Sequence, residues 1–205
     1  MDEYLANLIG LLLSDGSVYY DKSKRTYCIQ FTNKSTLLRN LFKRLMKQCF
    51  GVEKFYEISC KNAISVRVFS KNIADYLFRY SPTYRTLPLE QFPKANERSV
   101  LVGFKALHYN SVKYPPCKIP EEIFSQKRCV AAFLRGFTSG DGSICINKKH
   151  SIYRVELTCY HPFLRKQSVE CLSALGIPAS ARRNSVYVSG IANYQKFLRV
   201  VGFVR

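Results

Sequence analysis

The chain has 205 residues, 47% of them hydrophobic, and its 32 Lys and Arg against 14 Asp and Glu give a formal net charge of +18. This hydrophobic content supports a packed core and excludes a chain that is disordered throughout. The charge predicts a polyanionic partner, either nucleic acid or, as a weaker alternative, an anionic membrane surface. A membrane-surface protein would carry a basic amphipathic helix, whereas the basic residues here are spread over predicted strands and loops, so nucleic acid is favoured.

In chain order, the first half reads as helix, two strands, helix, two strands and helix. The first helix ends at Ser14. A helix over 35–50 has Ser35 as its N-cap and Gly51 just beyond its end. The other predicted elements are strands near 17–21, 25–32, 53–59 and 63–69 and a helix near 72–80.

A Pro-punctuated segment, SPTYRTLPLEQFPK, follows, and we predict a helix near 96–110 that stops at YPPCKIP. The order of elements then starts again. The second half has a helix from Ser125, strands near 143–147 and 152–158, a helix from Pro162, strands near 179–182 and 185–189, and a last helix from Ile191.

The two halves are copies of one module. Residues 8–16 read LIGLLLSDG and residues 134–142 read LRGFTSGDG, so Leu, Gly, Asp and Gly recur at an offset of 126, which also pairs Arg39 with Arg165. Later matches fall at smaller offsets, as expected for deletions in loops. The sequence therefore predicts an α+β fold of two pseudo-symmetric αββαββα repeats, 1–82 and 121–205, with a linker over 83–120 that contains a helical segment.

Alternation along the strands predicts one apolar and one polar face for each sheet. Near 25–32, Ile29 and Phe31 face the helices. On the same strand Cys28, Gln30 and Thr32 face outward. A four-stranded antiparallel sheet with polar and basic residues on its open face suits the reading of duplex DNA.

Small residues four positions apart mark the first helix of each repeat. They are Gly10 with Ser14 and Gly136 with Gly140. Residues at this spacing share one helix face, and small ones let two backbones approach closely. We predict that these faces pack on each other at a pseudo-two-fold axis and bring the two helix C-termini side by side.

An Asp-Gly pair ends each of these helices, and we expect each Gly to end its helix with a positive φ. Ordinary helix packing explains one such motif, but two in matching modules of a basic chain favour a site. Two carboxylates beside two helix C-termini repel unless a hard cation lies between them. Such a metal can activate water and stabilise the leaving oxygen in phosphodiester cleavage. We expect Mg²⁺, with Mn²⁺ or Ca²⁺ as substitutes for binding, held by Asp15, Asp141 and the carbonyls of Ser14 and Gly140.

The two motifs resemble the LAGLIDADG signature, and nearly the whole chain resembles a single-chain, two-repeat LAGLIDADG homing endonuclease of the intron-encoded type. The letters kept are Leu8, Gly10, Leu11, Asp15 and Gly16, then Leu134, Gly136, Asp141 and Gly142. The resemblance implies two saddle-shaped sheets astride a long, nearly non-palindromic site in double-stranded DNA. It implies a monomer whose catalytic acids, Asp15 and Asp141, bind Mg²⁺ over the minor groove. Both strands would be cut, leaving short 3′ overhangs.

The family also uses a polar residue at the end of the second strand to organise water. Asn33 matches it as a catalytic candidate, with Lys34 beside it; the alternative role for Asn33 is an Asx cap beside Ser35. The second repeat has Cys159 at this position, so the two sites are expected to be unequal. No residue is assigned as the auxiliary lysine of the family.

Outward strand residues and hairpin tips are the predicted DNA contacts. In the first repeat these are Tyr19, Asp21, Lys22, Lys24, Arg25, Gln30, Thr32, Lys34 and Arg67. In the second they are Asn147, Lys148, Lys149, Arg154, Glu156, Arg182, Arg183 and Tyr187. By contrast, the basic residues of the helix over 35–50 are expected to form a solvated face, namely Arg39, Lys43, Arg44 and Lys47.

Two other functions fit the same fold: an RNA-binding maturase that assists intron splicing, and a catalytically inactive DNA-binding regulator. Both motif acids are present, which favours the nuclease. No apolar stretch approaches the about 20 residues that span a bilayer, and Asp2 and Glu3 precede the first apolar run where a signal peptide needs positive charge. We therefore expect an intracellular protein, cytoplasmic or organellar, that is not secreted and does not contact membranes.

The eight Cys form no CxxC pair, and the three His are scattered. Most of the Cys lie in apolar runs. We expect them to be small buried hydrophobes in a reducing compartment rather than disulfides or a zinc site.

Overall fold

The computed structural model describes residues 1–21, 24–91 and 105–204. The first repeat consists of α1 (Glu3–Asp15), β1 (Gly16–Asp21), β2 (Thr26–Asn33), α2 (Thr36–Phe50), β3 (Tyr56–Cys60), β4 (Ala63–Phe69) and α3 (Lys71–Phe78). The caps explain two helix boundaries. The side chain of Ser35 accepts a hydrogen bond from the backbone of Leu38 at the start of α2, and Gly51 ends that helix with φ +67°.

The second repeat follows the same order: α6 (Lys127–Asp141), β7 (Gly142–Asn147), β8 (Ile152–Thr158), α7 (Pro162–Ala174), β9 (Ser180–Arg182), β10 (Ser185–Ser189) and α8 (Ile191–Val200). A short helix η2 (Lys148–His150) forms the β7–β8 turn. The predicted α+β fold of two αββαββα repeats is confirmed.

The linker differs from its prediction. Between the repeats lie η1 (Leu89–Gln91), a hairpin of β5 (Leu107–Tyr109) and β6 (Val112–Tyr114), and the short helix α5 (Glu121–Phe124). The helix expected near 96–110 is therefore wrong over its last residues. Asn110 and Ser111 have φ of +46° and +65°, which a turn accepts and a helix does not. Residues 96–104 of that prediction lie outside the described part of the chain.

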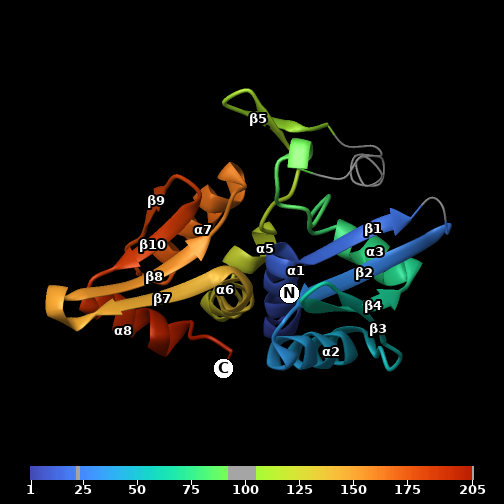
Figure 1. The fold of residues 1–205 in the computed structure, drawn as a ribbon, viewed down its shortest axis with the longest axis horizontal. Coiled ribbons are helices and arrows are strands. Elements are labelled where there is room, and N and C mark those ends of the chain that lie inside the picture. The colour runs from blue at the N-terminus through green and yellow to red at the C-terminus, as the bar shows by residue number, and fades with distance from the viewer. Residues whose placement is uncertain (22–23, 92–104, 205) are drawn as a thin grey trace.

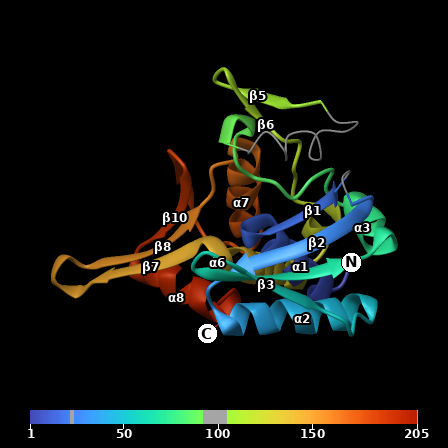
Figure 2. The ribbon, with the colours of Figure 1, turned by 45° about the vertical axis from the view of Figure 1, so that its right-hand side comes forward.

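Each repeat has one antiparallel four-stranded sheet, in the orders β1-β2-β4-β3 and β7-β8-β10-β9. Figure 1 shows α1 and α6 side by side at the centre, with the two sheets extending to opposite sides. Figure 2 shows α2 lying along the first sheet. The two repeats therefore meet through their first helices, and each carries its own sheet outward.

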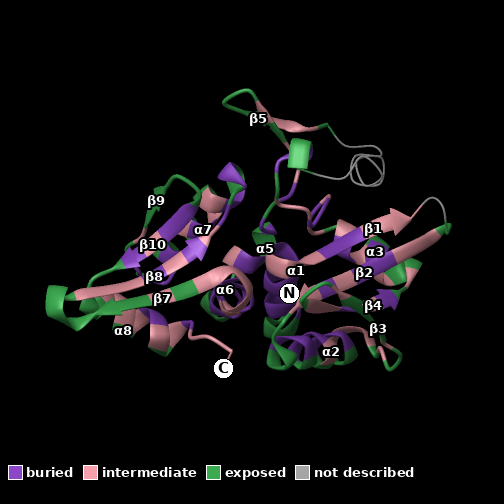
Figure 3. Ribbon diagram, in the orientation of Figure 1, coloured by how far each residue is buried: buried purple, intermediate pink, exposed green. Residues whose placement is uncertain are grey.

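The core runs through both repeats as one cluster. Leu8 to Leu13 of α1 are buried along with Phe133 and Phe137 of α6, and Ile29, Phe31, Val155 and Leu157 join them from the strands. Figure 3 shows this burial at the centre and exposure at the β7–β8 tip. None of the described helices is long and apolar enough to cross a membrane.

All eight cysteines are free thiols, and five of them are buried. This agrees with their predicted role as small buried hydrophobes. Of the other three, Cys49 and Cys60 are partly exposed and Cys145 lies exposed on β7.

Candidate functional site

Close contact between α1 and α6 sets the geometry of the site. A Cβ atom on Gly10 would lie 2.2 Å from the carbonyl oxygen of Phe133, and one on Gly136 would lie 2.2 Å from that of Asn7. No side chain fits at such distances, so the backbones touch where the small-residue spacing predicted. At the C-terminal end, a Cβ on Gly140 would lie 2.3 Å from Ser14 Oγ and 2.7 Å from Asp15 Oδ2. The last turns of the two helices are therefore pressed together.

Gly16 and Gly142 end these helices, but not as predicted. Their φ angles are −104° and −97°, which is extended backbone rather than the left-handed conformation. The requirement for glycine is steric. A Cβ on Gly16 would lie 2.5 Å from Leu12 Cα, and one on Gly142 would lie 2.3 Å from the Thr138 carbonyl oxygen. In each repeat the backbone passes directly from helix into strand and lies close against the last turn of that helix.

This geometry brings Asp15 and Asp141 together. The pKa of Asp141 is raised to about 7, first by burial and second by the negative charge of Asp15. Burial also raises the pKa of Asp15, and a hydrogen bond from Asn33 opposes that rise. The two acids from separate repeats thus form an interacting pair in which one carboxyl resists ionisation.

Asn33, the last residue of β2, contacts Asp15 and also forms the predicted Asx cap beside Ser35. Its Nδ2 donates to Asp15 Oδ2 at 2.8 Å. Its Oδ1 accepts from the backbone N–H of Ser35 at 2.7 Å. The second bond fixes the amide so that its donor faces Asp15, which favours the ionised form of that carboxyl.

The second repeat offers no such amide. Cys159 stands at the matching position, is buried, and its Sγ donates to the carbonyl of His161 at 3.5 Å. The pKa of Cys159 is raised to about 12, first by burial and also by the nearby charge of Asp141, while Arg165 opposes the rise. A neutral thiol therefore lies beside Asp141, and the two halves of the site are unequal.

One assignment from the sequence is wrong: Arg39 is not part of a solvated face. It is 8% exposed, and its Nη1 donates to the carbonyls of Asn33 and Lys34 at 2.9 and 2.7 Å. Arg165 does the same in the second repeat, where its Nη1 donates to the carbonyls of Cys159 and Tyr160 at 2.8 and 3.3 Å. Each arginine thus fixes the backbone at the matching position of its repeat, Asn33 in the first and Cys159 in the second. The offset of 126 that pairs these arginines was a signal for this role.

The other basic residues of α2 agree better with a solvated face. Lys43 pairs with Glu57, and Lys47 pairs with Glu53 at 3.6 Å. Both lysines contact acids at the surface, away from the acid pair.

A second feature missed by the sequence reasoning is the linker segment 84–87. It lines a pocket of about 410 Å³ together with Asp15, Asp141, Gln30 and Thr32. Tyr84 anchors it, because this buried side chain donates from its hydroxyl to the carbonyl of Leu77 at 2.9 Å. The guanidinium of Arg85 lies 5.6 Å from the centre of the Tyr19 ring. The linker thus brings a cation to the edge of the acid pocket.

On the first sheet, the strand register places most predicted contacts on one open face. Gln30 pairs with Ser17 and Arg67, and Tyr19 pairs with Cys28. Cys28 shares the face of Tyr19, as predicted, but Cys28 and Ser17 are only 1% and 2% exposed. Arg85 from the linker lies near this part of the sheet.

Of the remaining predicted contacts, Asp21, Lys24 and Arg25 lie at the β1–β2 hairpin tip, whereas Thr32 and Lys34 lie at the other end of β2. Asp21 accepts from the backbone N–H of Lys24 at 3.3 Å and so shapes the turn. Lys24, Arg25 and Lys34 are exposed, and Thr32 is partly exposed. Lys22 lies outside the described residues.

The second sheet is more open. Arg154, Glu156 and Tyr187 share its outer face, with the Arg154 guanidinium 5.3 Å from the centre of the Tyr187 ring. The residues at its tips and edge are exposed: Asn147, Lys148, Lys149, Arg182 and Arg183. Asn147 also accepts from the backbone N–H of His150 at 3.3 Å, so part of its role is to shape the turn.

The donors around the acid pair suit a hard divalent cation. They are the two carboxylates, and Ser14 and Gly140 add carbonyls that belong to the last turns of α1 and α6, where helix carbonyls lack an intrahelical partner. Within the described ranges, no three His, Cys, Asp or Glu side chains gather into a metal cluster. Burial and the charge of Asp15 raise the pKa of Asp141, and a cation between the two carboxyls would oppose both effects. A metal here would have two carboxylates and would complete its shell with carbonyls or water.

Comparison with known proteins follows the same division of the chain. A family model described as a LAGLIDADG-like domain matches residues 2–78 and 128–202. A search of curated proteins finds no match.

Solved structures match across nearly the whole chain. A structure of mesophilic variants of the homing endonuclease I-DmoI is 17% identical and covers 98% of this chain and 95% of that chain, with a TM-score of 0.61. I-DmoI in complex with DNA and Mn is 18% identical and covers 98% and 96%, with a TM-score of 0.61. Full-length WhiA from Thermatoga maritima is 17% identical and covers 99% and 56%, with a TM-score of 0.59. At these identities the likeness shows a shared fold.

Proposed function

The chain belongs to the LAGLIDADG-like family, and from this premise we propose that it is a site-specific DNA endonuclease that hydrolyses both strands of a long target site with the help of Mg²⁺. The observation that carries the proposal is that Asp15 and Asp141 line one pocket at the junction of two repeats, each with a basic open sheet. I-DmoI, whose fold is similar, is a homing endonuclease that has been crystallised with DNA and Mn, and with DNA and Ca. These neighbours support both the duplex substrate and the class of metal.

The two sheets supply the binding surface. Their open faces carry Arg67, Arg154 and Arg182, and the hairpin tips add exposed lysines. Cations at such positions contact phosphates and fix the register of a duplex, while Gln30 and Arg154 are placed on the faces where base edges would be read. A duplex that lies along both sheets places its backbone over the acid pair.

The acid pair supplies the chemistry. Asp15, Asp141 and the carbonyls of Ser14 and Gly140 would hold the metal, which when bound acts as a Lewis acid toward a phosphate oxygen and lowers the pKa of water. The hydrogen bond from Asn33 favours the ionised form of Asp15, against the effect of burial, and fixes the orientation of the carboxyl. With a pKa of about 7, the carboxyl of Asp141 is partly protonated near neutral pH. It must lose this proton before it can bind the metal.

The test is cleavage of a plasmid that carries the uninterrupted host-gene junction. We expect a double-strand break with Mg²⁺, none with EDTA, and none with Asp15→Asn or Asp141→Asn. Asp75→Asn, which removes an exposed carboxylate on α3, is the matched control and should cut normally. Salt-sensitive DNA binding without any cutting would contradict the nuclease and favour a DNA-binding regulator.

We also propose that the protein is an intracellular monomer. Because one chain contains both acids, a monomer suffices for the complete site. We propose that it acts inside the cell, where the free thiols stay reduced.

A further inference from the structure

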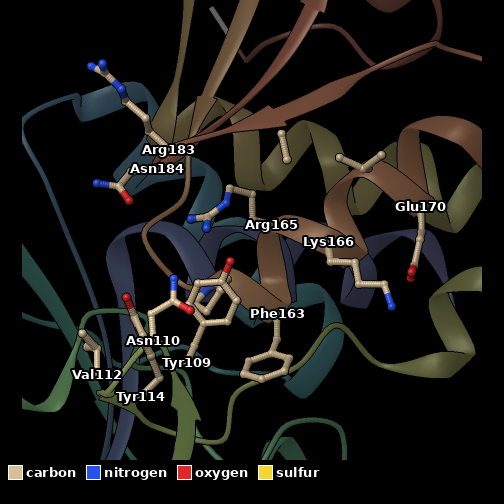
Figure 4. Close-up of a pocket in the computed structure, with 13 residues that line it drawn as sticks. Tyr109, Asn110, Val112, Tyr114, Phe163, Arg165, Lys166, Glu170, Arg183 and Asn184 are labelled. Carbon is tan, nitrogen blue, oxygen red and sulfur yellow. The ribbon is translucent and has the colours of Figure 1, made fainter.

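A second concave surface lies outside the acid pocket. It is a groove of about 890 Å³ between the β5–β6 hairpin, α7 and the β9–β10 turn, and none of its lining residues lines the acid pocket. Figure 4 shows its side chains coming from these three elements toward one space. Among the residues that line this groove, Arg183 alone was also predicted to contact DNA.

Exposed aromatic rings form one side of the groove. Tyr109 on β5 is 44% exposed and Phe163 at the start of α7 is 39% exposed. Their ring centroids are 6.4 Å apart in an edge-to-face arrangement. Behind them, Tyr114 packs on the buried ring of His161 with centroids 5.2 Å apart. Large rings that are held in place and still face solvent suit a partner with flat apolar surfaces of its own.

Cations form the other side. Arg165, Lys166 and Arg183 line the groove, and among its described lining residues Glu170 is the single acidic one. In Figure 4, Arg165 lies between the Arg183–Asn184 turn and the Tyr109 and Phe163 rings. Its hydrogen bonds to the carbonyls of Cys159 and Tyr160 hold the guanidinium at this place. Phosphates beside such cations, with bases stacked on the rings, make an unpaired nucleotide strand the occupant that fits both sides.

The groove is continuous with the proposed DNA surface. Arg183 lines both this groove and the hollow on the open face of the second sheet that contains Arg154 and Tyr187. Toward the centre, the carbonyl of Asn184 accepts from the backbone N–H of Cys159 at 2.7 Å, and Cys159 lines the acid pocket. A strand that leaves the duplex beside the acid pair therefore meets the groove next.

We infer that this groove binds a single DNA strand that separates from the duplex next to the acid pair, and so retains one end of the cut target. The inference rests on the proposed nuclease function for the source of that strand. Tyr109 and Phe163 are assigned to base stacking, and Lys166 and Arg183 to phosphates.

The test measures binding of a short fluorescein-labelled oligothymidylate to the full chain in EDTA, by anisotropy. Tyr109→Ala and Phe163→Ala should each weaken binding roughly tenfold, in line with the loss of one stacked base. Lys166→Ala, at an exposed position on α7, should weaken binding several-fold and flatten its salt dependence. Tyr4→Ala removes a tyrosine that is 54% exposed on α1, outside the groove, and should bind as the unmodified chain does.

The outcomes separate this inference from the proposed function. Unchanged oligothymidylate binding in all three groove variants would overturn the inference, even if the protein cuts DNA. Preferential binding of oligouridylate through the same residues would overturn the assignment to DNA. If the protein cuts, Tyr109→Ala should release the cut ends faster than the unmodified chain in a gel-retention assay. If it binds oligothymidylate through the groove but never cuts, the proposed function fails while the groove remains a single-strand site.

Discussion

Replacing Asp141 by Asn should stabilise the metal-free protein, and the gain should depend on pH in a defined way. The pKa of Asp141 is about 7 in the folded chain and 3.8 for the free side chain, because burial and the charge of Asp15 oppose its ionisation. The folded state therefore binds more protons than the unfolded state between these two values, and the free energy of unfolding falls as the pH rises through that window. The difference of about 3 units corresponds to about 4 kcal/mol.

Asn cannot ionise, so the free energy of unfolding of the Asp141→Asn variant does not fall in this way as the pH rises. We expect Asp141→Asn and the unmodified chain to differ little in stability below about pH 4. Above about pH 7 the variant should be more stable by up to about 4 kcal/mol. The assay is urea denaturation in EDTA across this range, with Asp75→Asn on exposed α3 as the matched control.

Mg²⁺ should narrow this difference in stability. The unmodified chain would gain about 2.7 kcal/mol at a metal concentration one hundred times its dissociation constant, whereas the variant would gain much less. A stability difference that is the same at every pH would refute the reasoning, because it would mean that Asp141 ionises freely in the folded protein.

Three further outcomes follow from the structure. Gly136→Ala places a Cβ 2.2 Å from a backbone oxygen and should lower the free energy of unfolding in urea by about 3 kcal/mol. Gly51→Ala is the control: its Cβ meets open space, only the positive φ strains it, and the loss should be about 1 kcal/mol. Asn33→Ala removes the hydrogen bond that lowers the pKa of Asp15, so the acid limb of the cleavage pH profile should move to higher pH; an unmoved limb would argue against this role. Arg85→Ala should weaken DNA binding and lower the slope of log K against log salt by about one, and an unchanged slope would exclude a phosphate contact.

Much of the fold was accessible from the sequence because it depends on local patterns. The strand alternation and the caps at Ser35 and Gly51 reflect contacts within a few residues, and the repeated nine-residue motif places its small residues on one helix face. The hairpin over 107–114 was missed: Asn110 and Ser111, whose φ values are positive, form its turn, and β5 and β6 pair on either side of it.

The site divides in the same way. The sequence by itself singled out Asp15 and Asp141 and predicted that small residues would let their helices meet, since spacing fixes which backbones can touch. Only the tertiary structure decided that Asn33 holds one acid while Cys159 stands beside the other, that Arg39 and Arg165 clamp the chain behind them, and that a linker residue, Arg85, reaches the same pocket. Burial and the direction of a side chain depend on neighbours far away in the chain. A charged residue on a helix therefore looks the same in the sequence whether it points to water or to a carbonyl of another segment.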